Sequence, residues 1–202
     1  MCKMQYYAER IKLCKFAKSL WDKRLTLATG GNMAMRVDEN RVLTTPTRMS
    51  EDKHGILEPE DMVLIDYELH HIEGNGIMTR EANIHAYILR EIPFVGACIH
   101  AHPQYSLIFC AACKPIPHMT ETTKEMGDTP VLPWAEAASE KLALICLDHF
   151  KSREVLLKNT GGLCAVMPEH GLVAVSRTIE EAFSIIDRVE SDAMVSLFSK
   201  LL

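Results

Sequence analysis

The stretch FVGACIHAHP, residues 94–103, joins an apolar run to two histidines and a proline. The apolar run predicts a buried strand over 94–102, and Pro103 ends its ladder of backbone hydrogen bonds. Side chains two apart on a strand point to the same face, so His100 and His102 converge on one point above the sheet. Two neutral imidazoles suit a metal such as Zn²⁺, although a pair of structural histidines fits the same spacing.

Helical and extended patterns alternate on both sides of this strand. Apolar residues recur at helical spacing over 5–23, 80–91, 104–113, 137–150 and 179–201. Strands are expected over 33–37, 41–44, 62–66, 70–73, 163–167 and 172–175, and the proline-rich stretch 114–133 is expected to be irregular. No low-complexity linker interrupts the alternation, so we expect one α/β domain over 1–202. Short hairpins favour a mixed sheet over a purely parallel one.

Composition limits the classes of function. The 202 residues carry 22 Lys+Arg against 27 Asp+Glu, a net charge of −5, and basic residues occur at most two in a row. This balance argues against a surface that follows nucleic-acid phosphates. The apolar runs fall well short of the roughly 18 residues that a membrane helix needs, and the N-terminal residues lack an apolar signal-peptide core. We therefore expect a cytoplasmic protein with neither nucleic acid nor membrane as a partner.

The cysteines are odd in number, so they cannot all pair with one another. Most lie in apolar stretches, which indicates buried thiols in a reducing compartment. The seven are Cys2, Cys14, Cys98, Cys110, Cys113, Cys146 and Cys164. The CxxC at 110–113 has the spacing of a redox motif or a zinc knuckle, but no second CxxC lies at zinc-ribbon distance. We interpret this segment as a buried helix face.

Two further residues extend the histidine pair. Glu81 begins the helix that leads into the strand, so the turn between them can bring its carboxylate over the strand's end. His170 precedes Gly171 at a turn between two apolar strands, where glycine permits a close backbone approach. Three nitrogen donors and one oxygen donor with an open position are the pattern of a catalytic metal site. His85 follows Glu81 by four residues on the same helix face and is interpreted as a packing position.

These residues stand within stretches that resemble the class II aldolase/adducin family. The family includes L-fuculose-1-phosphate and rhamnulose-1-phosphate aldolases, ribulose-phosphate 4-epimerases and methylthioribulose-phosphate dehydratases. The similar stretches occur in family order from about 29 to 190. They are TGGNMAMR (29–36), LTTPT (43–47), LEPEDMVLID (57–66), Glu81 with His100-Ala-His102, and EHGLVAV (169–175).

The resemblance implies a three-layer α/β/α domain with a central mixed, largely antiparallel sheet, assembled as a homotetramer. It implies a Zn²⁺ ion, or Mn²⁺ or Co²⁺ in its place, on His100, His102 and His170. Glu81 is then the fourth ligand or the base. Aldolases and dehydratases similar to this chain carry Glu at this position, whereas the epimerases tend to carry Asp.

We therefore expect a metal-dependent aldolase that cleaves a small ketose phosphate or a related hydroxy-carbonyl compound. Retro-aldol cleavage develops negative charge on the carbonyl oxygen, which a divalent cation stabilises as a Lewis acid, and the reaction proceeds through an enediolate. A carboxylate beside the ion accepts or returns the carbon-bound proton. A dehydratase or 4-epimerase on the same scaffold, a non-catalytic adducin-like interaction domain and a CxxC redox module are the alternatives.

The phosphate pocket of the family has altered counterparts in this chain. The family builds it from a Gly-Asn turn, a Thr-Gly pair and two adjacent serines. The corresponding residues here are Gly31, Asn32, Thr47, Arg48, Thr79 and Arg80. Two guanidiniums can bind a phosphate or a carboxylate bidentately, so we expect a small anionic sugar-like substrate. Arginines that merely flank surface loops are the alternative.

The sequence offers three candidates for a second acid or base. The similar aldolases use a tyrosine from a neighbouring subunit, but no tyrosine follows Tyr105 in this chain. The equivalent segment reads PHMTETTKEMGD (117–128), and the similar dehydratases place a glutamate in this region. We therefore predict Glu121 as the second acid/base. His118 and Glu125 are rivals, and a solvated loop is the other interpretation.

Overall fold

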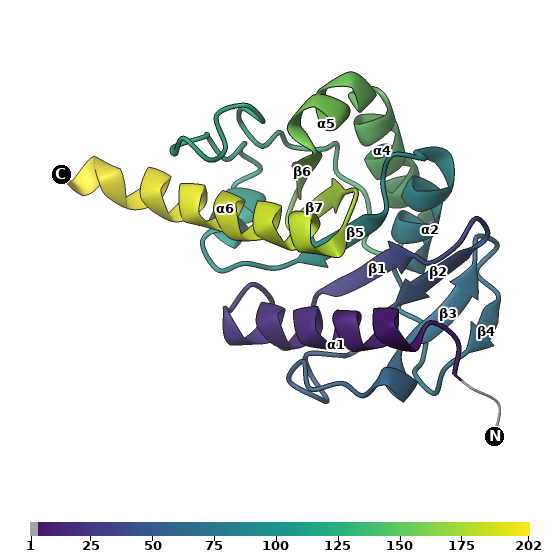
Figure 1. Cartoon of the computed structure of the whole chain (residues 1–202). Helices are drawn as coiled ribbons and strands as arrows, with labels where there is room; N and C mark the ends of the chain where they lie inside the picture. The colour runs from purple at the N-terminus through teal and green to yellow at the C-terminus, as the bar shows by residue number, and fades with distance from the viewer. Residues whose placement is uncertain (1–3) are drawn as a thin grey trace.

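A seven-stranded sheet forms the centre of the molecule, in a computed structural model that describes residues 4–202 (Figure 1). The spatial order of the strands is β4-β3-β2-β1-β5-β7-β6, and every pairing between them is antiparallel over the described residues. The strands are β1 (Asn32–Arg36), β2 (Arg41–Thr44), β3 (Val63–Asp66), β4 (His71–Glu73), β5 (Ala97–Ala101), β6 (Gly162–Met167) and β7 (Gly171–Ser176). The expectation of a largely antiparallel sheet is confirmed.

Helices cover both faces of this sheet and complete the three-layer arrangement. One face carries α1 (Tyr7–Asp22), α3 (Ser106–Ala111) and α6 (Ile179–Phe198). The other face carries α2 (Ala82–Glu91), α4 (Glu140–Lys151) and α5 (Glu154–Thr160). The described residues also form two short 3₁₀ helices, η1 (Pro59–Asp61), which contacts α1, and η2 (Ser199–Leu201), which follows α6.

Strand β5 lies between β1 and β7, and its side chains are buried on both faces. Ala97 and Ile99 pack into the core under α1 and α6, whereas Cys98 packs into the core under α2 and α4. Because side chains alternate along a strand, His100 follows Cys98 onto the α2 side. The alternation of side chains along β5 thus determines that the histidines lie on the α2 side of the sheet.

The structure differs from the sequence patterns in a few elements. Helix α5 was not expected. Strand β5 is shorter than the predicted strand over 94–102, because a turn precedes it in which the Val95 N–H donates a hydrogen bond to the Ile92 carbonyl. The expected buried helix face over the CxxC is half right: Cys110 is buried, but Cys113 is exposed just after α3 ends. Cys2 lies outside the described residues.

None of the described helices is long and apolar enough to cross a membrane.

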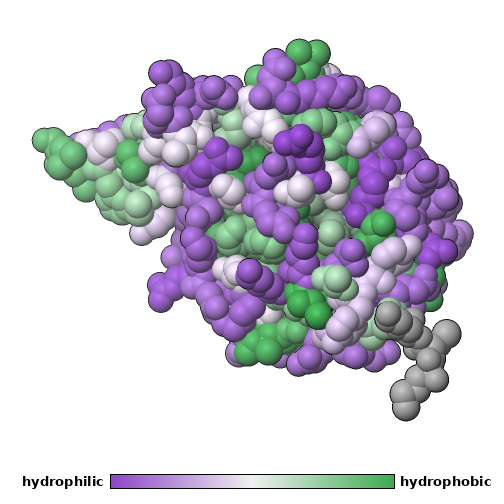
Figure 2. Space-filling model, viewed as in Figure 1, coloured by the Kyte–Doolittle hydropathy of each residue, from purple (hydrophilic) through white to green (hydrophobic). Residues whose placement is uncertain are grey.

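The C-terminal end of α6 projects from the body of the molecule (Figure 1). Apolar surface gathers on this projection, at the left of Figure 2. Its large exposed apolar side chains are Met194, Phe198, Leu201 and Leu202. The remainder of the face seen in Figure 2 is mostly hydrophilic.

Candidate active site

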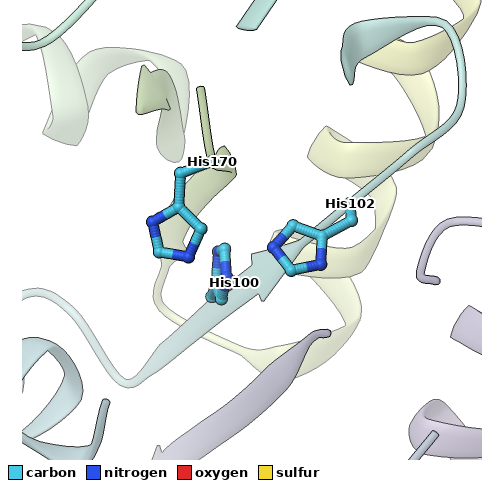
Figure 3. Close-up of side chains that lie close together, drawn as sticks. All are labelled: His100, His102 and His170. Atoms are coloured by element: carbon cyan, nitrogen blue, oxygen red, sulfur yellow. The ribbon is translucent and has the colours of Figure 1, made fainter. Parts of the chain in front are cut away.

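Three histidine side chains converge at the end of β5 (Figure 3). The ring centroids of His100 and His102 are 4.5 Å apart, and those of His100 and His170 are 4.6 Å apart. One nitrogen from each ring can be chosen so that all three nitrogens lie within 4.8 Å of one another. This spacing allows the three rings to share one metal ion.

The sheet itself brings these histidines together. In the antiparallel pairing of β5 with β7, His100 faces Val173 and Ala101 faces Leu172. Strands β6 and β7 form a hairpin whose last pair is Met167 with Gly171, so His170 occupies the turn next to the end of β5. The HxH pair and a turn residue 70 positions away are therefore neighbours.

Two glycines leave the room that the histidine rings occupy. A Cβ atom added to Gly30 would overlap the ring of His102. A Cβ atom added to Gly171 would overlap the same ring and would lie 2.5 Å from the carbonyl oxygen of Ala101. The close backbone approach expected at Gly171 is therefore real, and Gly30 provides the same room on the other side of His102.

The backbone partner of His100 fixes which of its ring nitrogens donates. Its Nδ1 lies 2.8 Å from the carbonyl oxygen of Leu172, which can only accept a hydrogen bond, so Nδ1 carries a proton and the neutral ring offers Nε2 as its lone-pair donor. A backbone carbonyl in this role is the usual support of a metal-binding histidine.

Three ring nitrogens at this site are buried without any hydrogen-bond partner in the described chain: Nε2 of His100, Nε2 of His102 and Nδ1 of His170. Burial, reinforced by neighbouring imidazoles, lowers the pKa of His102 to about 2 and that of His170 to about 4. Both rings are therefore neutral at physiological pH, which is the form that binds metal. Since an unpaired buried polar atom costs about 1–3 kcal/mol, a cation with nitrogen ligands fits this donor set.

Glu81 lies directly against the three rings. It occupies the N-cap position of α2, but its side chain makes no capping hydrogen bond. Its Oε1 lies 3.2 Å from Nε2 of His170, and its Oε2 lies 3.4 Å from Nε2 of His100. Burial raises the pKa of this carboxyl, but the imidazoles of His100 and His170 and a hydrogen bond from Asn32 outweigh burial and lower the pKa to about 2. The carboxylate is therefore charged at neutral pH.

A pocket opens beside Glu81, and every residue predicted for the anion site lines it. The lining combines residues of a glycine-rich turn, hydroxyl side chains and two arginines with Glu81 and two of the converging histidines. It comprises Thr29, Gly30, Gly31, Asn32, Thr47, Arg48, Thr79, Arg80, Glu81, His102, Ala137, Ala138 and His170. The structure thus gathers six predicted binding residues around one cavity, although their roles stay predictions.

The two arginines of this pocket differ in their surroundings. Arg48 forms ion pairs with Glu51 at 3.1 Å and Asp52 at 3.0 Å. Arg80 has no carboxylate partner in the part of the chain that the structure describes. Arg80 is therefore the more available guanidinium for an anionic ligand.

Glu121 lies outside this pocket. Its side chain is 87% exposed and is 3.7 Å from Nζ of Lys124. It lines a separate hollow with Lys124 and Arg188, near α6. Within one chain, Glu121 therefore lies apart from the pocket that Glu81, His102 and His170 line.

The sequence patterns did not predict the hydrogen bonds that Asn32 makes with Glu81 and with His85. The Asn32 side chain donates a hydrogen bond from Nδ2 to Oε2 of Glu81 at 2.9 Å. Its Oδ1 lies 2.5 Å from Nε2 of His85, which is fully buried. The four-residue spacing of Glu81 and His85 placed them on one helix face, but no sequence pattern joins either residue to β1.

A substitution at the turn histidine tests the metal centre. We expect His170→Gln to lower the affinity of the purified apoprotein for Zn²⁺ by at least about 100-fold, because one of three nitrogen donors is lost. Competition with a chromogenic chelator measures this affinity. His149→Gln is the matched control, since its Nε2 is also buried and unpartnered but the residue lies outside the pocket. Equal affinities of His170→Gln and the unsubstituted protein would contradict the site.

Known proteins that are similar to this chain include aldolases and a dehydratase that act on sugar phosphates. An L-fuculose phosphate aldolase of Methanococcus maripaludis is 27% identical over 190 residues, which are 92% of this chain and 93% of the relative. A methylthioribulose-1-phosphate dehydratase of Pectobacterium atrosepticum is 36% identical over 75 residues, 37% of this chain and 35% of the relative. A solved structure of an L-fuculose 1-phosphate aldolase has a TM-score of 0.83 and 22% identity, covering 99% of this chain and 90% of that one, and shows likeness of fold.

The family comparison is broader than any single relative. Residues 11–197 match the family described as Class II Aldolase and Adducin N-terminal domain. The match covers nearly the whole chain and includes all of the histidines at the end of β5 as well as Glu81. The chain therefore belongs to the class II aldolase and adducin N-terminal domain family.

Proposed function

We propose that the protein is a divalent-metal-dependent aldolase that cleaves a small ketose phosphate or a related hydroxy-carbonyl compound. The observation that carries the proposal is the set of unpartnered, buried imidazole nitrogens beside a charged carboxylate, at the base of a pocket that holds two arginines. An adducin-like scaffold without catalysis has no use for this arrangement, because it buries polar atoms at a cost in stability.

We further propose Zn²⁺ as the resident ion, with Mn²⁺ and Co²⁺ as substitutes. His100, His102 and His170 would hold it, and Glu81 is close enough to be a fourth ligand or to act as the base. When bound, the ion supplies a Lewis acid that polarises a carbonyl group.

Glu81 is the residue that handles the carbon-bound proton in this proposal. In the direction of aldol addition, its carboxylate removes a proton from the carbon beside the carbonyl group. In the direction of cleavage, the second acid/base takes the proton of the carbinol hydroxyl, the bond between that carbon and the carbinol carbon breaks, and an aldehyde forms. Glu81, after gaining a proton from solvent, gives that proton to the carbon, which has kept the electron pair of the broken bond. The low pKa keeps the group charged at neutral pH, which is the state that addition requires.

The other pocket residues are proposed to bind the anionic group of the substrate. Backbone N–H groups of the Gly31–Asn32 turn, the hydroxyls of Thr47 and Thr79 and the guanidinium of Arg80 offer donors of the right kind. Arg48 is a second cation at the rim, engaged by Glu51 and Asp52. This set of donors favours phosphate or carboxylate over an uncharged sugar.

We also propose a homotetramer in which Glu121 of one subunit serves the pocket of its neighbour as the second acid/base. The high exposure of Glu121 leaves it free to enter a contact, and the apolar projection of α6 offers surface for one. Assembly is needed in this proposal because one chain does not bring Glu121 to its own pocket.

A panel of ketose phosphates tests the reaction. We expect the metal-loaded protein to convert at least one ketose 1-phosphate to dihydroxyacetone phosphate and an aldehyde, and Glu81→Gln to lower kcat by about 10²- to 10⁴-fold. Mass spectrometry reads the products. Loss of one water identifies a dehydratase, and an isomer of unchanged mass identifies an epimerase; either result would replace the aldolase proposal. Chelation of the ion should abolish turnover.

Substitution of the unpaired arginine tests the anion site. With the substrate found by the panel, Arg80→Ala should raise KM about 10- to 100-fold, because a charge-assisted hydrogen bond is worth about 1.5–3 kcal/mol. Arg48→Ala should have a smaller effect, since its guanidinium already has carboxylate partners. Arg90→Ala, on the outer side of α2 beside Glu91, is the control. An unchanged KM in Arg80→Ala would remove that residue from the site.

Mixed oligomers test the role of Glu121. Glu121→Gln and Glu81→Gln should each lower kcat by about 10²- to 10⁴-fold, and co-expression of the two should restore activity, because some pockets then combine both intact residues. Light scattering should give four times the mass of one chain. Glu125→Gln tests Glu125, the nearby alternative for the second acid/base, by the same measurement. Full activity of Glu121→Gln, or mixed oligomers as inactive as the parents, would exclude this arrangement.

A further inference from the structure

A chain of two hydrogen bonds runs from the interior of α2 to the carboxylate of Glu81. His85 is fully buried and does not line the pocket, so it has no direct access to a ligand there. Its Nε2 lies 2.5 Å from Oδ1 of Asn32. The Nδ2 of Asn32 in turn donates to Oε2 of Glu81 at 2.9 Å.

The donors and acceptors of this chain fit together in only one way when the carboxylate is charged. An ionised carboxylate only accepts, so the NH₂ group of Asn32 must face Glu81 and the amide oxygen must face His85. The amide oxygen also only accepts, so Nε2 of His85 carries the proton. Nδ1 of His85 is then bare, and it is indeed buried without a partner.

The two oxygens of the carboxylate are therefore unequal. Oε2 is held by Asn32, whereas Oε1 is buried and has no hydrogen-bond partner in the described chain. Both oxygens face the histidine rings, since Oε1 lies 3.2 Å from Nε2 of His170 and Oε2 lies 3.4 Å from Nε2 of His100, so it is the hydrogen bond from Asn32 that distinguishes them. A held oxygen and a free oxygen on one carboxylate are suited to a base that must take up a proton at a defined atom.

We propose that His85 is a positioning residue: its Nε2–H fixes the orientation of the Asn32 amide, so that Asn32 restrains Oε2 of Glu81 and leaves Oε1 as the proton-transferring atom. The inference deepens the proposed function and rests on Glu81 being the base of that reaction. Without the Nε2–H donor, the Asn32 amide can turn, and the turned amide would place its oxygen against the carboxylate. The carboxylate would then lose its hydrogen bond and its fixed direction.

A pair of variants separates this role from simple packing. His85→Leu keeps an apolar side chain in the core but removes the donor, whereas His85→Gln can place an amide N–H near the position of Nε2. We expect His85→Leu to lower kcat about 10- to 100-fold with KM within about twofold, and His85→Gln to restore most of the loss. His149→Leu, a histidine outside the pocket, controls for the loss of a partly buried imidazole.

A second measurement does not need turnover. The side-chain NH₂ protons of Asn32, followed by NMR in the metal-free protein, should exchange with solvent slowly in the unsubstituted protein and in His85→Gln, but faster in His85→Leu. If no substrate is found, the proposed function fails while this exchange still reports on the hydrogen-bond chain. Unchanged exchange and kcat in His85→Leu, or failure of His85→Gln to differ from it in either readout, would overturn the positioning role.

Discussion

The antiparallel register of β5 and β7 is the constraint on which the site depends. Because His100 faces Val173 across this ladder, the turn that carries His170 ends beside His102. The Leu172 carbonyl also accepts a hydrogen bond from Nδ1–H of His100, so that Nε2 is the nitrogen turned toward Glu81. A slip of one residue would turn both strand histidines to the opposite face of the sheet, away from Glu81. The fold and the chemistry therefore share one set of backbone hydrogen bonds.

The apolar cores on both faces of the sheet stabilise the fold and so offset the cost of burying the polar groups of the site. Strand β5 is buried beneath helices on both faces, so the ladder that holds the histidines is shielded from water. The same burial keeps the rings of His102 and His170 neutral and strengthens each electrostatic contact with Glu81. The site concentrates unsatisfied polar atoms in a scaffold that is otherwise well packed, which is the balance expected where binding or catalysis takes place.

Local patterns in the sequence located most elements and the three histidines that converge at the end of β5. The apolar run that ends in HxH and the glycine turn after His170 are short-range features, and a single sequence displays them. Helix α5 was missed because it is only seven residues long and has one fully buried side chain, Leu157, so its periodicity is weak. The link between His85 and Asn32 joins residues 53 positions apart and arises only when α2 packs over β1, so no local pattern predicts it.

Gly30 and Gly171 flank the ring of His102 and contribute no side chain of their own to a guest molecule. Even a methyl group at either position would displace that ring. Substitution of either glycine is therefore as restricted as substitution of a histidine, although the reason is steric rather than chemical. In a homologue that has all three histidines but alanine at either position, we expect the His102 ring to be displaced from the other two rings, so that the three can no longer share one ion.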